Sequence, residues 1–539
     1  MKRWCMRIVL PMVATLYVAA TACAAAEPAP VPAEVTMQHW SCRDVAELGR
    51  KYDADKKLSR SVVVEGKHCP RDEAAECLLS VMAKVVKKCE TEGPGAVSRE
   101  DLARIARLQE ELGDQLNDMD GYRTLRESIA QMLAKPELPP FVLKAGINGF
   151  LRGEGTDSFR LPDFSYAPDH AEGRFLYRVK PYTYWHPTDY LDIHVEGEGY
   201  GFTGGSQYNG RISLYQGFIE GRLPGNDRLS LKVGRQEFTY GSTFILGGNA
   251  FYDGLVFDAV RLRVRPTEAL TVDLLGGLYG TPYNIGLKGN LSGLYASYRF
   301  SGENVVEAYG FHDTGSADHH GGEYRDSWGV RGTAELGPVH VELEPVYQTG
   351  KVFDPGSGGN DDISAYGGHL DMSLETTLAK RKNTFLLGYS LGSGDREAAT
   401  GTRFRKEFRN PNNDSFLHGD MSVVGDYSGI TVNDRHASGL HDVTLGWGMD
   451  LTDRLNLTAT GHYFLADEVP DGFSRDLGLE TDFVVTYTLN DNLSLLCAYD
   501  RFFTGRFYRD AAGSGGDIQY GYLMLQFDLS KAWPRGMKR

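Results

Sequence analysis

The chain has 539 residues, a formal net charge of -15 and a mean hydropathy of -0.35. The acidic balance argues against nucleic acid as a partner. No run of about 18 apolar residues follows Ala20, which excludes transmembrane helices. The 64 Gly, 29 Tyr and 25 Phe are typical of an all-β chain with many tight turns.

Residues 1–26 have the parts of a secretory signal peptide. A basic start precedes an apolar segment at 8–20 and small residues at 24–26. We therefore expect the mature chain to begin at Glu27. The alternative is lipid attachment at Cys23, but Ala20 stands where a lipoprotein signal usually has leucine.

Residues 27–135 are expected to form a helical periplasmic region stabilised by disulfides. The candidates are Cys42, Cys69, Cys77 and Cys89. Four cysteines in a short exported segment suggest two disulfides, with three possible pairings. A zinc site is the alternative, although no CxxC pair occurs. Cys497 stands alone in a predicted strand and is expected to be a buried or lipid-facing apolar residue.

The segment 98–133 begins with a capping pattern at Ser98 and continues as an amphipathic helix. Its apolar residues recur at steps of three and four: Leu102, Ile105, Leu108, Leu112, Leu116 and Met119. Two interpretations stay open. The stripe is either a coiled-coil stalk through which the chain oligomerises or one side of a helix packed on its own small domain.

This N-terminal part also resembles a known arrangement. The sequence SREDLARIARLQEELGDQLNDMDGYRTL resembles the stalk of bacterial porins that carry an S-layer-homology-type cell-wall-binding module. The preceding CPRDEAAECLLSVMAKVVKKC is similar only to the helical part of that module, whose Gly/Tyr-rich loop is absent. The resemblance implies that residues 27–135 bind peptidoglycan.

Residues 141–531 show apolar residues at every second position, and their connections alternate between short and long. Outer-membrane barrels have this organisation, with short turns in the periplasm and long loops outside. We predict an all-β, single-chain antiparallel barrel of about eighteen strands in the bacterial outer membrane, followed by a basic tail at 532–539. A soluble sandwich is the alternative. The loops at 241–253 and 393–438 are candidate gates.

The best-defined motif lies at LKVGRQEFTYGS and FYDGLVFDAVRLRV, two strands joined by a Gly/Asn-rich loop. This hairpin resembles the alginate-export family of outer-membrane barrels. The matching residues are Gly234, Arg235, Gln236, Glu237, Tyr240, Gly241, Phe257, Asp258, Val260 and Arg261. The resemblance implies a passive channel for an anionic polysaccharide or a related solute, without a cofactor.

A channel for a polyanion needs cations along its wall, and arginine suits carboxylates. The candidate lumen cations are Arg178, Lys180, Arg235, Arg261, Arg263, Arg299, Arg325 and Arg331. In a regular strand Arg235 would point to the same face as the apolar Leu231 and Val233. It can therefore face the lumen only if the strand has a bulge at Gly234. Alternatively, these cations pair with wall carboxylates, and the protein is a general porin tethered to peptidoglycan.

Motifs for catalysis and metal binding are weak. No GxSxG elbow, HExxH helix or phosphate loop occurs. The nearest catalytic candidates are His436 and His441. The nearest metal ligands are His312, His319 and His320 and the loop 354–362. We expect neither an enzyme nor a metal site. A third possibility is a barrel that only tethers the membrane to the cell wall.

Overall fold

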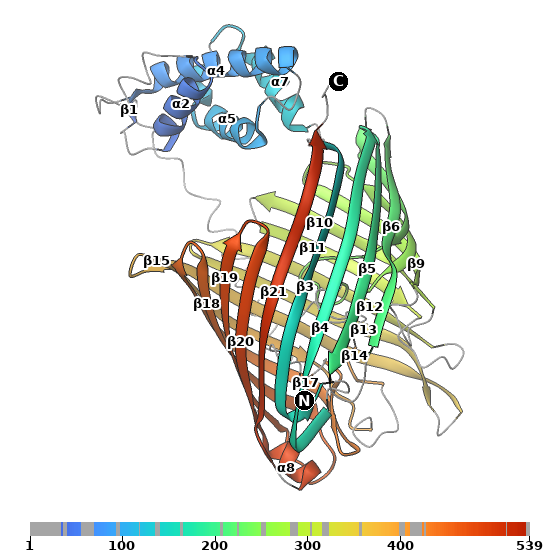
Figure 1. Ribbon diagram of the computed structural model, residues 1–539. Coiled ribbons are helices and arrows are strands. Elements are labelled where there is room, and N and C mark those ends of the chain that lie inside the picture. The colour runs from blue at the N-terminus through green and yellow to red at the C-terminus, as the bar shows by residue number, and fades with distance from the viewer. Residues whose placement is uncertain are drawn as a thin grey trace, which may run out of the picture. The chain divides into compact units, whose positions relative to one another are not determined.

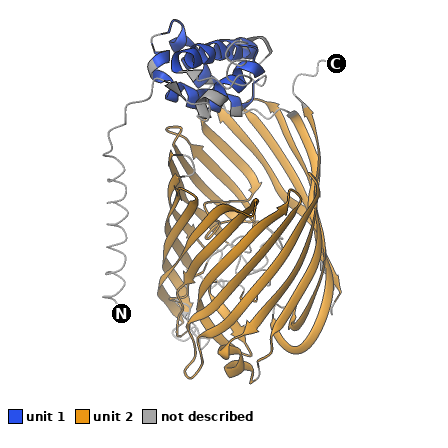
Figure 2. Cartoon of the chain, turned by 90° about the vertical axis from the view of Figure 1, so that its left-hand side faces the viewer, with its two compact units in different colours: residues 1–138 blue, residues 139–539 orange. Residues whose placement is uncertain are grey.

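The computed structural model describes residues 34–35, 40–54, 69–92, 97–117, 119–134, 141–161, 165–204, 209–223, 226–248, 255–280, 289–301, 304–314, 323–354, 358–397, 405–409, 423–424, 427–513 and 515–534. The predicted signal peptide and residues 535–539 lie outside this range. The chain divides into two compact units, residues 1–138 and 139–539 (Figure 2). None of the described helices is long and apolar enough to span a membrane.

Unit 1 is a small helical bundle with its own apolar core. Its helices are α2 (Trp40–Lys51), α4 (Arg71–Glu92), α5 (Arg99–Glu111), α6 (Gly113–Leu116) and α7 (Tyr122–Ala134), and a two-residue pair joins β1 (Glu34–Val35) to β2 (Cys69–Pro70). Ser98 caps α5, because its hydroxyl accepts a hydrogen bond from the backbone of Asp101. The helices bury Val45, Leu78, Val81 and Ile129 against one another.

The apolar stripe of residues 102–116 is part of this core. Leu102, Ile105, Leu108, Leu112 and Leu116 are all buried within the unit. The helix also breaks at Leu112, between α5 and α6, and a second turn contains Gly121 at φ +82°. The stripe therefore has no free surface for a coiled-coil partner, and the structure supports the interpretation of a small domain over that of an oligomeric stalk.

The cysteines of unit 1 do not all pair as expected. Cys77 and Cys89 are both buried in α4, while the side chains of Cys42 and Cys69 lie outside the described residues. Cys89 has a free thiol, so the expected two disulfides, which require all four cysteines, do not form. Pairing among the other three stays a prediction. Cys497 is a free cysteine on the exposed outer face of its strand.

Unit 2 is a closed antiparallel barrel of eighteen long strands (Figure 1). In chain order its elements are β3 (Phe141–Arg160), β4 (Ser165–Thr188), β5 (Leu191–Gly204), β6 (Asn209–Leu223), β7 (Asn226–Gln236), β8 (Phe257–Val264), β9 (Leu270–Tyr279), β10 (Asn290–Ser301), β11 (Asn304–Asp313), β12 (Tyr324–Leu336), β13 (Val339–Asp354), β14 (Gly359–Leu378), β15 (Arg381–Gly392), β16 (Gly429–Val432), β17 (Arg435–Thr452), β18 (Leu455–Glu468), β19 (Asp476–Asn490), β20 (Leu493–Thr504), α8 (Arg506–Ala512) and β21 (Ile518–Pro534).

Each strand pairs with its neighbour in sequence, and β21 pairs with β3 to close the wall. The short β16 pairs with β17, which also pairs directly with β15. Closure gives each described long strand of the barrel a partner on both sides, as a wall in lipid requires. The predicted fold class and strand number are confirmed. β21 runs to Pro534, so the start of the predicted tail is strand.

Several strands are longer than the alternation predicts. Residues 153–171 lack the alternating pattern of a strand, yet β3 and β4 extend through most of this segment and pair up to Arg160 and Ser165. The segment 350–361 also lacks that pattern and is mostly strand. These segments are rich in Gly and polar residues because both faces of a strand beyond the membrane meet water, and so they lack the period-two signal.

The two faces of the wall separate as predicted. Trp328, Val330 and Leu445 are exposed on the outside, while Glu196 and Asp442 are buried inside. At the end with the short turns, outward aromatic rings include Trp185, Tyr190, Tyr298 and Trp533. Aromatic residues at this level are typical of the membrane–water interface. The lumen is polar near the short turns, and inward-folded loops fill it near the long loops.

Candidate functional site: the lumen and its inward loops

The inner wall of β4 to β6 holds cations within a network of carboxylates. Arg178 donates from Nε to Oε1 of Glu198 at 2.5 Å, and both side chains are buried. Lys180 lies 3.5 Å from the centre of the Tyr215 ring and 3.9 Å from Oε1 of Glu196. Both cations face the lumen as predicted, and both are already engaged with the wall.

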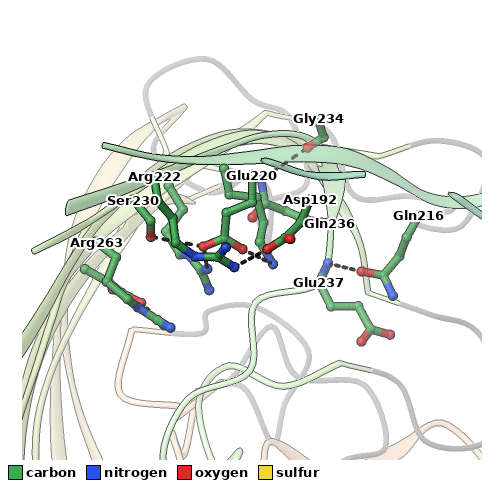
Figure 3. A network of polar contacts seen from close by, with 12 residues as sticks. Asp192, Gln216, Glu220, Arg222, Ser230, Gly234, Gln236, Glu237 and Arg263 are labelled. Atoms are coloured by element: carbon green, nitrogen blue, oxygen red, sulfur yellow. Dashed lines mark hydrogen bonds and ion pairs between the residues drawn. The ribbon is translucent and has the colours of Figure 1, made fainter. Parts of the chain in front are cut away.

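The next strands repeat this arrangement. Arg263 of β8 binds Asp273 of β9 through two 2.7 Å hydrogen bonds, and Arg261 lies 3.3 Å from Glu220. Figure 3 shows Glu220 beside Asp192 and Arg222, which form another ion pair. The cross-strand register explains these contacts, because Arg263 is paired with Asp273, and Lys232 is the partner of both Glu220 and Arg261.

Arg331 and Arg325 lie on the inner face of β12. Arg331 makes a bidentate ion pair with Glu342, with hydrogen bonds of 2.8 and 2.9 Å, and donates to Glu307 at 2.5 Å. Arg325 is buried and donates to Oε1 of Gln348 and to the backbone oxygen of Glu407, which belongs to a loop. These arginines therefore hold the wall and a loop together.

Arg299 is the most open of the predicted cations. It has the inward parity of Tyr295 on β10, lies next to a short turn and is exposed. No ion pair of Arg299 occurs among the described residues. Its guanidinium is thus available to a solute at the short-turn mouth of the lumen.

Arg235 does not face the lumen, contrary to the prediction. The pairing of β7 with β6 and β8 is continuous through Gly234, so no bulge changes its parity. Gly234 instead has φ +128°, and a side chain there would meet the backbone of Gly217. Arg235 binds Asp258 through two 2.8 Å hydrogen bonds on the outer face, next to Val233 and Val260.

The remaining motif residues direct the following loop into the barrel. Gln236 is buried inside, where its amide donates to the backbone of Ala259. Tyr240 donates to Asp273 at 2.9 Å and stacks on Tyr295 at 4.4 Å. Gly241 lies against Arg331 and Tyr295, where a side chain would be tight. Ser242 then donates to Glu344 of β13 at 2.5 Å.

Two loops meet inside the barrel. Phe244, with 0 % of its surface exposed, stacks on Phe408 at 5.5 Å and contacts Tyr427 at 4.9 Å. Its ring centre is 5.2 Å from that of His369 on β14. The predicted candidate gates, 241–253 and 393–438, therefore contact each other through their described residues, and they obstruct the lumen at its long-loop end.

One group of residues that sequence reasoning missed could hold a metal. Ligand atoms of Glu342, Glu344 and His369 lie within 4.8 Å of one another. All three already bind protein partners, since Arg331, Tyr309 and Asp371 occupy them. Only the register of β13 and β14 brings Glu344 opposite His369, and their separation in sequence gives no such signal.

The weak catalytic candidates do not form a catalytic arrangement. His441 contacts Tyr389 at 2.7 Å and Asp467 at 3.2 Å, and His436 contacts Glu407 at 2.9 Å. His312 pairs with Asp326. These contacts stabilise strands and loops. His319, His320 and the residues between 354 and 358 in the suggested calcium loop lie outside the described range.

Charge is divided between two sectors of the inner wall. Among the described residues, lysine and arginine outnumber carboxylates on the inner face of β3 to β10, where the cations are Lys144, Arg152, Arg174, Arg178, Lys180, Arg211, Arg222, Lys232, Arg261, Arg263 and Arg299. Between residues 440 and 528, the described inner face of β17 to β21 has no lysine or arginine and carries Asp442, Asp450, Glu480, Asp482, Asp500 and Asp528. The lumen therefore has a basic side and an acidic side.

Similar folds occur among solved structures of porins. OccAB1 of Acinetobacter baumannii aligns with a TM-score of 0.50 and 13% identity over 74% of this chain and 99% of that one. A BenF-like porin from Pseudomonas fluorescens Pf-5 aligns with a TM-score of 0.50 and 12% identity over 72% and 99%. At these identities the likeness shows the fold alone. No curated protein sequence matches this one significantly.

The family model described as alginate export matches residues 210–519, from β6 to the start of β21. The match includes the hairpin of β7 and β8, the loop with Tyr240 and Gly241 and most of the barrel. It therefore covers more than half of the chain and agrees with the closed porin-like wall. This protein of the bacterial outer membrane belongs to the alginate-export family.

Proposed function

We propose that the protein is a passive outer-membrane channel for an anionic polysaccharide or a related acidic solute, and not an enzyme. The observation that carries this proposal is the basic sector of β3 to β10, which continues to the exposed Arg299 at the short-turn mouth. An anionic chain moving along this side meets successive cations at short spacing. The membership of the alginate-export family supports the same class of solute.

The paired cations favour a second candidate, a general porin. Arg178, Arg263 and Arg331 each bind a wall carboxylate, which reduces the net field that a passing anion meets. A lumen with one basic and one acidic side also admits small solutes of either sign. The two candidates differ in one measurable property, the ratio of anion to cation permeability.

Two matched arginine substitutions test the proposal. In planar bilayers with a KCl gradient, we expect the wild-type reversal potential to indicate anion preference. Arg261→Gln should reduce that preference, because it removes a lumenal cation and leaves Glu220 without it. Arg235→Gln makes the same chemical change on the outer face and should leave the reversal potential unchanged. Equal permeability to both ions in the wild type would favour the general porin.

A further inference from the structure

The inner wall near the short turns carries aromatic rings. Contact with lipid does not explain these rings, because they face the lumen. Tyr184, His194 and Phe218 are successive cross-strand partners on β4, β5 and β6. The ring centres of Tyr184 and His194 are 4.0 Å apart, and those of His194 and Phe218 are 5.1 Å apart. The outward Trp185 serves the membrane interface, but these three rings face the lumen.

Lysines lie at both ends of this row. Lys144 is the cross-strand partner of Tyr184 on β3 and lies 5.6 Å from the ring centre of Tyr182. Lys232 lies 4.0 Å from the ring centre of Phe218. We call Lys144, Tyr182, Tyr184, His194, Phe218 and Lys232 the aromatic–lysine strip. Because the ring contacts position the ammonium groups, rings and charges form one surface.

Part of the strip is accessible to a solute that enters from the short-turn side, because Tyr184 is exposed while His194 behind it is buried. Tyr184 is 36% exposed, and its hydroxyl makes no hydrogen bond within the described part of the chain. A recess of about 410 Å³ adjoins the strip and includes Asn148, Lys180, Gln526 and Asp528 in its lining. Asp528 accepts a hydrogen bond from Tyr182 at 3.1 Å, which connects the recess to the strip.

A sugar ring carrying a carboxylate matches this surface. The C–H groups of a pyranose pack against aromatic carbons, and an ammonium group binds the carboxylate. We propose that the aromatic–lysine strip is a binding site for a linear chain of uronic acid residues at the short-turn entrance. This proposal rests on the proposed channel function and adds to it an aromatic contact that distinguishes acidic sugars from other anions.

Current blockade by three probes tests the site. A linear hexamer of mannuronic acid carries rings and charges, hexaglutamate carries charges alone, and maltohexaose carries rings alone. For the full-length protein in planar bilayers, we expect mannuronate to block at the lowest concentration. Tyr184→Ala and Phe218→Ala should each raise its half-blocking concentration about tenfold, which corresponds to one lost stacking contact. Both should leave the block by hexaglutamate unchanged.

Matched variants separate binding from misfolding. Tyr184→Phe keeps the ring and should retain the wild-type block. Tyr298→Ala removes an outward ring near the same rim and should have no effect. Lys232→Gln should weaken the block by both anionic probes. Unchanged single-channel conductance shows that a variant is folded.

The proposal would be overturned if Tyr184→Ala and Phe218→Ala left the mannuronate block unchanged while Lys232→Gln weakened it, because binding would then be electrostatic only. Failure of the proposed function would be seen in a different measurement. The wild-type reversal potential would then show no anion preference, whatever the aromatic variants do.

Discussion

The ion pair of Arg235 and Asp258 is placed on the side of the wall that otherwise carries apolar residues. The carboxylate is 48% exposed, and its two hydrogen bonds to the guanidinium satisfy both oxygens. The pair lies at the long-loop ends of β7 and β8, where the wall leaves the apolar part of the membrane. Charges near this level cost less than charges at the bilayer centre, so a fork-shaped pair is tolerated there.

Replacing one residue of this pair should destabilise the barrel more than replacing both residues. We expect Arg235→Ala to lower the free energy of unfolding by about 1–3 kcal/mol, because Asp258 is left without its partner on an apolar surface. Arg235→Leu combined with Asp258→Leu should restore most of that loss. Urea titration of the protein in lipid vesicles measures both. A double variant as unstable as the single one would contradict the prediction.

The alternation of residues predicts which face of a strand a side chain occupies, but it does not predict the partner of that side chain. It correctly places Arg261 and Arg331 inside, because a strand turns every second side chain the same way. It misplaces Arg235, because an arginine among apolar residues suggests a bulge that the continuous pairing of β7 does not contain. The partner of Arg331 depends on the register of β12 with β11 and β13, which no local pattern specifies.

At the scale of elements, the segment from Glu237 to Gly248 determines how much of the lumen is open. Its contacts differ along its length: Tyr240 binds the basic side through Asp273, Ser242 reaches Glu344, and Phe244 enters a cluster with Phe408 and Tyr427. Since Phe244 packs against both Phe408 and Tyr427 of the other loop, it is a point at which this obstruction can be weakened.

We expect Phe244→Ala to open the channel. Truncating a buried phenylalanine removes about 3–5 kcal/mol of packing, which is enough to detach a loop from its neighbours. Single-channel conductance should rise above the wild-type value. Ile212→Ala, on the exposed outer surface, is the control and should change nothing. An unchanged conductance of Phe244→Ala would mean that these loops do not limit the flow of ions.

In unit 1, Asp101 links α2 to the start of α5. Its carboxylate accepts hydrogen bonds from Lys51 at 2.5 Å and Tyr52 at 2.6 Å. Burial alone would raise the pKa of Asp101, but the bonds from Lys51, Tyr52 and Ser98 outweigh it and lower the pKa. A lowered pKa in the folded state means that Asp101 stabilises the unit above about pH 4 and that this contribution is lost as the pH falls further.

Asp101→Asn should therefore destabilise unit 1 at pH 7 by about 1–3 kcal/mol. As the pH falls through the lowered pKa of Asp101, the wild type should lose the same contribution, and the two proteins should converge. Hydrogen exchange of residues 40–54 and 99–111 measures this in the full-length protein. Asp120→Asn changes an exposed carboxylate and should have no effect. A constant difference between Asp101→Asn and wild type down to pH 2 would contradict the assignment.

The start of α5 is predictable from sequence, whereas its end is not. Ser98 and the apolar steps from Leu102 define the beginning, because capping is a local interaction. The stripe continues across Gly113, so periodicity alone suggests a longer helix. The chain turns there because α7 packs back on α4 and α5, and those contacts join residues that are distant in sequence.

At the scale of the whole molecule, the alternation of short and long connections predicts the barrel, because antiparallel neighbours require it. The filling of the lumen could not be predicted in the same way. Phe244 and Phe408 are far apart in sequence and lie in polar, glycine-rich segments, which are equally typical of loops in water. Their burial depends on the inner wall opposite them, including His369.

The division into two units leads to a final prediction about the cell wall. Unit 1 has a separate apolar core, so its removal should leave the barrel folded. We propose that unit 1 tethers the channel to peptidoglycan, and we expect the full-length protein, but not a barrel lacking residues 27–135, to sediment with purified sacculi. Both proteins should conduct ions equally. Sedimentation of both would place the contact in the barrel, and sedimentation of neither would remove the tether while leaving the channel intact.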